Sequence, residues 1–402
     1  MTTSAIDGRR WVTAWQSPPT DAATPGDASL TPLLAGPFGQ VQSFRAVLSP
    51  LGAGHQIRIH LSNRFGAAPV TLTSVSVAQR LRGPVIDPAT SVPVLFSGGP
   101  TVTIGAGLDV FSDGVDFSVA PFDDIAVTLD VAEPGNIPTH HFTARQTSYA
   151  TVPGVRPGVD AAAFTQTTTL RPYVIGLDVL SDEASAVVTL GDSITDGFQG
   201  PASLLPQDTS TIDLNQRYPD YLKRRIDAAG LPFFVANAGI SGNRVCTDGD
   251  VPALGPAAGR RLDTDVLAQC AVGTVIWLEG INDIGLTHGL TVDDLAAGYT
   301  SVIGRLHDRG LTVLQGTLTP SGGNSRPSYG ALGQDLRRAV NHWIRTQSPA
   351  DAVVDFEAAV ADPANPDHLD ARYDGGDGLH LNPFGYQRLA EAVDLDLLTG
   401  AP

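Results

Sequence analysis

Residues 186–197 read AVVTLGDSITDG, and this stretch decides how the second half of the chain folds. The run at 186–190 is short, apolar and rich in β-branched residues, which is typical of a parallel strand buried on both faces. A glycine and polar residues follow at once, so the strand is expected to end in a turn that carries Ser193. Sheets of this kind bind their ligands at the carboxyl ends of the strands, which is where this serine stands.

Strand-like and helix-like segments alternate from here to the end of the chain. Apolar runs that predict strands lie at 233–236, 274–278, 311–314 and 352–356, and helical spacing occurs at 218–229, 292–308 and 332–346. Thr291 is suited to cap a helix, and Pro383 is suited to open a last one that ends near residue 395. The alternation predicts a domain over residues 181–402 with a parallel sheet covered on both faces.

The chain before residue 181 has a different pattern, with almost no helical periodicity. Candidate strands lie at 41–48, 56–62, 70–79, 101–104, 125–131 and 149–152. Turn clusters such as SPLG at 49–52 separate them. Many short strands at this spacing predict an all-β sandwich or jelly roll over residues 1–180.

Charge and hydropathy limit the classes of partner. The 402 residues carry a formal net charge of −17, and an acidic surface repels nucleic acid phosphates and anionic membranes, so neither is expected as a partner. No apolar run is long enough to predict a transmembrane helix. Residues 1–11 lack the apolar core of a signal peptide, so the protein is expected to be cytoplasmic, or secreted with its leader already removed.

Two cysteines, Cys246 and Cys270, are too few for a disulfide framework or a zinc site. They flank one segment, and a bridge between them in an oxidising compartment stays open, because closeness in sequence does not establish bonding geometry. The adjacent pair His140 and His141 is assigned to the β-rich region and not to a metal site.

Three residues are suited to nucleophilic catalysis. A serine hydroxyl such as that of Ser193 is a poor nucleophile unless a base takes its proton. His380 is the natural base, because Asp377 precedes it by three residues and can accept from its Nδ1–H, which leaves Nε2 for the serine. Each residue alone also has an ordinary role, as a helix-capping serine or a surface histidine.

Two further residues are suited to stabilise an oxyanion. Gly242 lies in NAGISGN at 237–243, and a missing side chain lets its backbone N–H approach a substrate. Asn282 lies in GIND at 280–283, and its amide donates a hydrogen bond without being deprotonated. As isolated residues both are also common in turns.

In order and in strand context, the four segments resemble the four sequence blocks of the SGNH hydrolase superfamily, also called GDSL lipases and esterases. The blocks are GDSITDG at 191–197, NAGISGN at 237–243, GIND at 280–283 and DGLH at 377–380. The resemblance implies a flavodoxin-like three-layer α/β/α domain, a triad of Ser193, His380 and Asp377, and no metal or organic cofactor. It also implies an oxyanion hole made by the backbone N–H groups of Ser193 and Gly242 and the side chain of Asn282. The GxSxG motif of the α/β-hydrolases is absent around Ser193.

The β-rich region is similar to the domain that precedes the catalytic domain in a bacterial subgroup of GDSL esterases. The similarity rests on the stretch from Trp11 to Trp15 and on SNRFG at 62–66. It implies a sandwich packed on the hydrolase domain. Two roles stay open for it: it shapes one wall of the cleft, or it contributes only to stability.

These features predict a serine ester hydrolase that cleaves short-chain, acetyl-type acyl esters through an acyl-enzyme. A carbohydrate or polysaccharide O-deacetylase is the alternative, and a lipase or thioesterase fits less well because no apolar lid segment is evident. The expected partner is a small-molecule or glycan ester. A carbohydrate-binding protein with an inactive hydrolase domain is the rival from another class, and the complete set of site residues argues against it.

Four charged residues border the site in sequence. Arg244 is expected to support its loop through an ion pair more than to bind substrate, and Asp283 is expected to be a structural carboxylate. Asp374 is the runner-up acid, but it lies six residues before His380 and fits less well than Asp377. Asp196 borders the site in sequence, close to Ser193, and no role is predicted for it.

Overall fold

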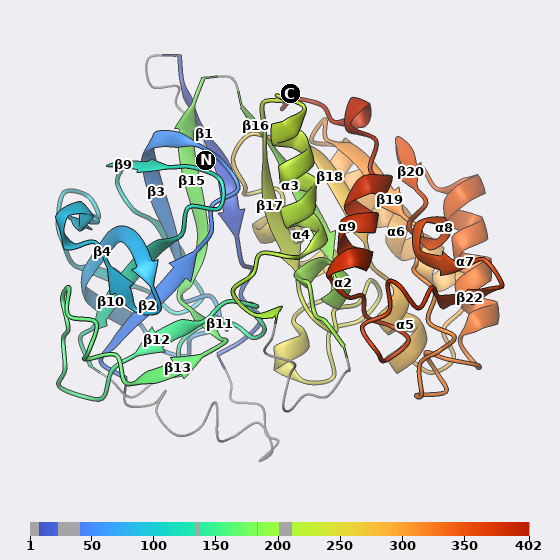
Figure 1. The fold of residues 1–402 in the computed structure, drawn as a ribbon, viewed down its shortest axis with the longest axis horizontal. Helices are drawn as coiled ribbons and strands as arrows, with labels where there is room; N and C mark the ends of the chain where they lie inside the picture. Colours follow the sequence, from blue (N-terminus) through green and yellow to red (C-terminus); the bar gives the residue numbers. More distant parts are fainter. Residues whose placement is uncertain (1–7, 23–40, 134–136, 183, 201–210, 402) are drawn as a thin grey trace.

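A parallel sheet organises the second half of the chain, as the alternating pattern predicts (Figure 1). The computed structural model describes residues 8–22, 41–133, 137–182, 184–200 and 211–401. Within these ranges the sheet has five strands, in the order β17 (Phe233–Gly239), β16 (Ser185–Gly191), β18 (Val272–Leu278), β19 (Thr312–Gly316) and β20 (Ala352–Val354). All neighbouring pairs are parallel, and the three central members of this order are almost entirely buried, as a sheet covered on both faces requires.

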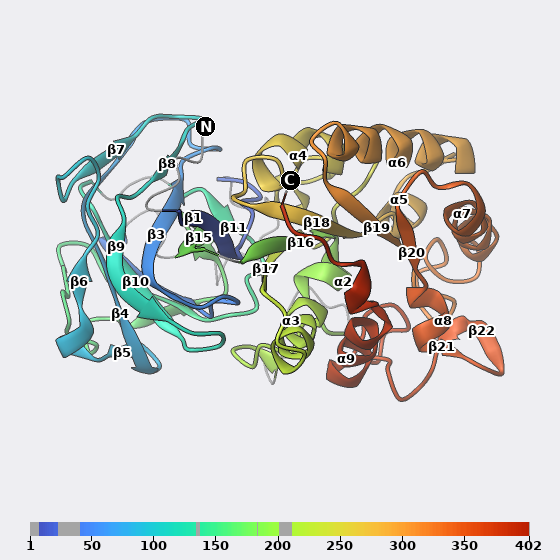
Figure 2. The same ribbon diagram turned by 90° about the horizontal axis from the view of Figure 1, so that it is seen from above.

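Helices cover both faces of this sheet (Figure 2). On one face lie α4 (Ala258–Asp265), α6 (Val292–His307) and α7 (Gln334–Gln347), and on the other lie α3 (Tyr218–Ala228), α8 (Phe356–Val360) and α9 (Pro383–Ala392). Two short helices, α2 (Ser193–Asp196) and α5 (Ile281–Leu286), follow β16 and β18. The second half therefore has the three-layer α/β/α fold that the resemblance of its sequence blocks implies.

Some boundaries differ from the sequence-based expectation. The apolar run predicts a strand that ends at residue 236, whereas β17 continues to Gly239 and includes Asn237. The Asn237 amide donates to the Thr195 carbonyl (2.9 Å) and accepts from the Gly239 N–H (2.8 Å), so its polar atoms are satisfied inside the sheet. The last helix ends at Ala392 because Asp394 caps a separate 3₁₀ turn at Leu395–Leu397.

Two antiparallel sheets form most of the β-rich first part of the chain. In the described residues, one sheet has the order β1 (Arg10–Gln16), β15 (Val174–Ser181), β3 (Gly54–Ser62) and β8 (Asp109–Phe111), and β9 (Val115–Val119) also pairs with β3. The other has the order β13 (Gln166–Thr168), β12 (Ser148–Ala150), β2 (Ser43–Leu48), β10 (Ile125–Val131), β4 (Val70–Arg82) and β5 (Val85–Ile86), with β6 (Val92–Pro93) and β7 (Val102–Ile104) beside β4. Side chains of both sheets share one apolar core, which is the sandwich arrangement.

Two short strand pairs and two further 3₁₀ turns complete the described elements. The pairs are β11 (His140–His141) with β14 (Arg171–Pro172), and β21 (Ala361–Asp362) with β22 (Asn365–Leu369). The turns lie at Pro88–Thr90 and Pro252–Leu254. None of the helices in the described ranges is long and apolar enough to span a bilayer. Residues 1–7, most of the stretch searched for a signal peptide, lie outside the described residues.

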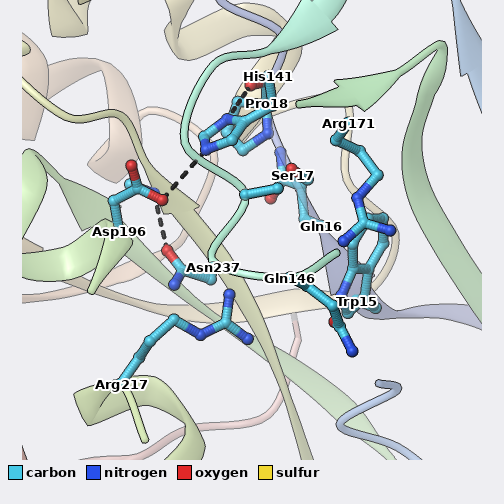
Figure 3. Close-up of a pocket in the computed structure, with 12 residues that line it drawn as sticks. Trp15, Gln16, Ser17, Pro18, His141, Gln146, Arg171, Asp196, Arg217 and Asn237 are labelled. Atoms are coloured by element: carbon cyan, nitrogen blue, oxygen red, sulfur yellow. Dashed lines mark hydrogen bonds and ion pairs between the residues drawn. The ribbon is translucent and has the colours of Figure 1, made fainter. Parts of the chain in front are cut away.

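The β-rich region and the parallel sheet meet at β17. Strand β1 packs against β17, and the Val235 N–H of β17 donates to the Leu51 carbonyl (3.3 Å). Arg64, from the SNRFG stretch, pairs with Asp265 of α4 (2.9 Å). Figure 3 shows a polar cavity at this junction, of about 10 Å³, which is room for roughly one water molecule. One continuous core spans both regions, so the division of the chain at residue 180 stays a prediction.

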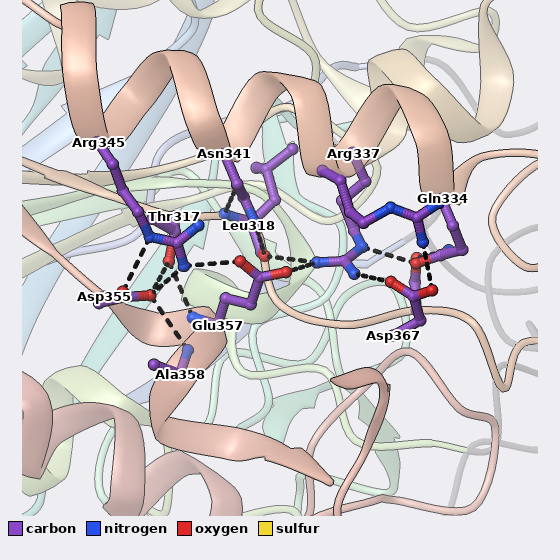
Figure 4. A network of polar contacts seen from close by, with 12 residues as sticks. Thr317, Leu318, Gln334, Arg337, Asn341, Arg345, Asp355, Glu357, Ala358 and Asp367 are labelled. Carbon is purple, nitrogen blue, oxygen red and sulfur yellow. Dashed lines mark hydrogen bonds and ion pairs between the residues drawn. The ribbon is translucent and has the colours of Figure 1, made fainter. Parts of the chain in front are cut away.

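A network of buried ion pairs anchors α7 (Figure 4). The fully buried guanidinium of Arg337 pairs with Glu357 of α8 and with Asp367 of β22 (2.9 Å), and its Nε donates to Gln334 (2.7 Å). Its neighbour Arg338 also reaches Asp367, but its side chain is about half exposed. The two adjacent arginines therefore differ mainly in burial.

Arg337→Met should lower the free energy of unfolding by about 3 kcal/mol, because it removes the buried cation and leaves Glu357 and Asp367 only their more exposed partners Arg345 and Arg338. Arg338→Met is the matched control and should cost less than about 1 kcal/mol, since exposed ion pairs contribute little. Chemical denaturation of the two variants measures the difference. Equal losses would show that burial does not set the strength of this network.

Candidate active site

Ser193 opens the short helix α2 directly after β16, at the carboxyl edge of the sheet. The preceding Asp192 caps this helix, because its side chain accepts from the Ile194 N–H (3.0 Å). Gly197 ends the helix with φ of 93°, a left-handed conformation that favours glycine. This geometry fixes the serine at the position that the sequence predicts.

His380 and Asp377 meet Ser193 from the loop before α9. His380 Nε2 lies 2.9 Å from Ser193 Oγ, and His380 Nδ1 lies 2.7 Å from Asp377 Oδ2. The other Asp377 oxygen accepts from the backbone N–H groups of Leu379 (3.0 Å) and His380 (2.8 Å). Burial opposes ionisation of Asp377, but the hydrogen bonds and charge of His380 outweigh it and lower the pKa of the carboxyl to about 2.

Gly242 and Asn282 are also brought to this edge. Gly242 has φ of 81°, and a Cβ at this position would lie 2.4 Å from the Leu254 side chain, so only glycine fits without strain. Asn282 Nδ2 donates to the Asn243 carbonyl (3.0 Å), which places the amide against the loop that carries Gly242. One amide hydrogen is used by this bond, and the amide carries two.

Hydrogen bonds join the four predicted segments to one another. Ser193 contacts His380, and Asn282 contacts Asn243, as above. The remaining link is made by Asp196, whose carboxylate accepts from the Ser241 backbone N–H (3.1 Å). All the residues predicted for the site therefore lie on one connected group of loops.

Several residues that support the site could not be found from local sequence patterns. The Tyr329 hydroxyl donates to Asn282 Oδ1 (2.7 Å), and burial raises the pKa of Tyr329, which keeps the hydroxyl protonated. The ring of Phe198 lies 4.7 Å from that of His380. Asn324 Nδ2 donates to the Asp377 carbonyl (2.8 Å). These contacts join residues far apart in the chain, so no local pattern predicts them.

The family model of the GDSL-like lipase/acylhydrolase family matches residues 189–388, a range that holds all four segments. This range is a GDSL-like acylhydrolase domain. The protein is therefore a hydrolase, and the resemblance of its four sequence blocks to the SGNH superfamily is confirmed.

Solved structures similar to part of this chain include three esterases, and in each case the match covers 52% of this chain. A carbohydrate acetylesterase from Sinorhizobium meliloti is 18% identical over 95% of its chain, with a TM-score of 0.39. An acetylxylan esterase from Geobacillus stearothermophilus is 23% identical over 92% of its chain (TM-score 0.37), and an aryl esterase from M. smegmatis is 19% identical over 96% (TM-score 0.41). No curated protein matches the chain.

The charged neighbours of the site in the GDSL domain have structural partners. Arg244 pairs with Asp250, and Asp283 accepts from the backbone N–H groups of Val245 and Cys246 (both 2.8 Å). Asp374 accepts from the N–H groups of two glycines in its own loop, at positions 376 and 378. The hydrogen bond to His380 is made by Asp377, as the spacing predicts.

The two cysteines and the histidine pair also have defined places. Cys246 and Cys270 are both free thiols, so the bridge left open by the sequence is not formed. His140 and His141 form the buried strand β11 of the β-rich region. Within the described residues, no cluster of His, Cys, Asp and Glu side chains could hold a metal ion.

Buried carboxyl groups lie beneath the site of the GDSL domain. Glu279 follows β18, is 2% exposed, and accepts from the Trp277 indole N–H (2.8 Å). Burial raises its pKa to about 7, and burial also raises the pKa of Asp192 well above its usual value. A carboxyl group whose pKa is higher in the folded than in the unfolded chain stabilises the fold below its unfolded pKa, and this stabilisation is lost as the pH rises through the folded pKa.

Glu279→Gln removes this titration. The unfolding free energy of the variant minus that of the wild type should rise by about 3 kcal/mol between a pH of about 4.5 and a pH of about 7, because only the wild type loses stability in this range. Denaturant unfolding at several pH values measures the difference. The exposed substitution Glu391→Gln is the control and should follow the wild type throughout. A difference between Glu279→Gln and the wild type that does not change with pH would contradict the raised pKa.

Proposed function

We propose that this protein is a serine ester hydrolase in which Ser193 is the nucleophile, His380 the general base and Asp377 the residue that orients the base. The observation that carries the proposal is the unbroken hydrogen-bonded path from Ser193 Oγ through both ring nitrogens of His380 to Asp377. A serine, an imidazole and a carboxylate in this arrangement are the groups that acyl transfer needs.

The proposed reaction has two halves. Ser193 Oγ attacks the ester carbonyl carbon while His380 Nε2 accepts its proton, and the resulting imidazolium is stabilised by the Asp377 carboxylate. His380 then gives the proton to the leaving alcohol, which leaves an acyl group on the serine. Water, deprotonated by the same imidazole, attacks the acyl-enzyme and releases the carboxylic acid. Protein groups and water supply every proton transfer in this scheme.

The backbone N–H groups of Ser193 and Gly242 and the side chain of Asn282 are the proposed donors to the oxyanion. The positive φ of Gly242 supports this role, because it allows a turn without a side chain over the N–H group. Tyr329 supports the role of Asn282: its hydroxyl holds Oδ1, so the NH₂ end of the amide points the other way.

Short acyl groups are the proposed substrates. The reacting residues are nearly enclosed, with 5% of Ser193, 6% of His380 and 4% of Asn282 exposed. Such restricted access favours a small acyl group over a long lipid chain. Hydrolysis of acetate, butyrate, octanoate and palmitate esters of p-nitrophenol tests chain length, and an acetylated glycan beside them tests for O-deacetylation. A preference for palmitate would overturn the assignment to short chains.

Ser193→Ala should abolish the burst of p-nitrophenol and all turnover of p-nitrophenyl acetate, because no acyl-enzyme forms without the hydroxyl. His380→Ala should keep substrate binding and lose turnover. Ser301→Ala, an exposed position on α6, is the matched control and should keep the wild-type rate. Wild-type activity in Ser193→Ala would refute the proposed mechanism.

Asn282→Ala should lower kcat by about 10²-fold to 10³-fold with little change in KM, the loss expected for one oxyanion donor. Tyr329→Phe keeps the ring and removes only the hydrogen bond that orients the amide, so kcat should fall by a smaller factor, about 10-fold. Steady-state kinetics on p-nitrophenyl acetate separates the two constants. A rise in KM at constant kcat in either variant would place the residue in ground-state binding instead.

A further inference from the structure

The carboxylate of Asp196 is a point where three parts of the chain meet. It lies at the end of α2, three residues after Ser193, and is 4% exposed. Oδ2 accepts from the Ser241 backbone N–H (3.1 Å), from the Ser241 hydroxyl (2.6 Å) and from the Thr143 hydroxyl (2.6 Å). Oδ1 lies 3.1 Å from His141 Nε2 (Figure 3).

Two of these partners come from the β-rich region. His141 belongs to β11, and Thr143 follows this strand by two residues. The other ring nitrogen of His141 lies 2.6 Å from the Pro18 carbonyl, so both nitrogens face acceptors. An imidazolium ring donates to both acceptors, and in that form His141 is ion-paired with the buried Asp196 between the two regions.

The third partner connects Asp196 to the oxyanion loop. Ser241 directly precedes Gly242, and Asp196 closes the helix that begins at Ser193. One carboxylate therefore sets the spacing between the proposed nucleophile and the proposed oxyanion donor. A shift of this spacing by about 1 Å is enough to cost about 10²-fold in rate.

We infer that His141 and Thr143 are positioning residues, through which the β-rich region holds Asp196 and thereby fixes the Gly242 loop against Ser193. The inference rests on the proposed function, in which Ser193 and Gly242 act on the same carbonyl group. It assigns the β-rich region a part in the geometry of the active site.

The charge state of Asp196 agrees with this role. Burial alone would raise its pKa, but the charge and hydrogen bond of His141 and the hydroxyls of Ser241 and Thr143 lower the pKa below its usual value. A buried ion pair adds little net stability compared with apolar side chains of the same size. What the pair adds here is a set of directed hydrogen bonds that hold two loops in one geometry.

The test compares two threonines that both bridge the regions. Thr143→Val removes one donor to Asp196 at nearly constant volume, and Thr143→Ser restores the hydroxyl. Thr13→Val is the matched control, because the buried Thr13 hydroxyl accepts from the Cys270 N–H across the same junction (2.8 Å) and touches neither Asp196 nor Ser241. For p-nitrophenyl acetate, Thr143→Val should lower kcat by about 10-fold to 100-fold with KM within about twofold, while Thr143→Ser and Thr13→Val stay near the wild type.

Two results would overturn the inference. One is a wild-type kcat in Thr143→Val; the other is an equal loss of kcat in Thr143→Val and Thr13→Val that follows a common loss of thermal stability. His141→Gln probes the same carboxylate from its other donor and should also lower kcat at constant KM. Ser193→Ala, assayed in parallel, separates a failure of the proposed function from a failure of the positioning role. If Ser193→Ala is active, the proposed function fails. If it is inactive while the Thr143 and His141 variants keep full kcat, only the positioning role fails.

Discussion

The hydrogen bond between Ser193 Oγ and His380 Nε2 is the contact on which the rest of the site depends, because it joins loops 187 residues apart in the chain. In this fold the contact forms because parallel strands deliver the loops at their carboxyl ends to one edge of the sheet. Strands β16, β17 and β18 do so in register, with Gly191 opposite both Gly239 and Leu278. The loops that follow these three strands carry the serine, the glycine and the asparagine, and the loop before α9 supplies the histidine.

Burial alone raises the pKa of each of four carboxyl groups around this edge, but the net pKa shift differs because their hydrogen-bond donors differ. Glu279 receives one indole N–H and Asp192 one backbone N–H, and burial raises the pKa of both. Asp377 and Asp196 are also removed from water, yet several donors and a histidine each lower their pKa. The two carboxyl groups whose pKa is lowered are thus the ones that contact a histidine and several hydrogen-bond donors.

Local patterns were enough to predict many of the elements and the residues that the fold brings together at the proposed site. The strand at 125–131 and the helix starts at Thr291 and Pro383 follow from alternation, capping and the fixed φ of proline, all of which act within a few residues. Strands β1 and β15 were not predicted. They pair with each other from opposite ends of the β-rich sequence, and β1 also packs against β17. The contacts of Tyr329 with Asn282, and of His141 with Asp196, depend on which distant segments the fold brings together, and no local spacing encodes that.

Strand β17 has one side paired with β16, and in an isolated α/β domain its other side would be an open edge of the sheet. Here β1 and the Leu51 carbonyl occupy that side, with Phe233 and Phe234 buried against the β-rich region. Open edges with apolar flanks invite intermolecular pairing and aggregation. The hydrolase half excised at residue 181 would therefore expose the edge of β17 and its apolar residues. In the intact chain the β-rich half covers this edge and so prevents it from pairing with other molecules.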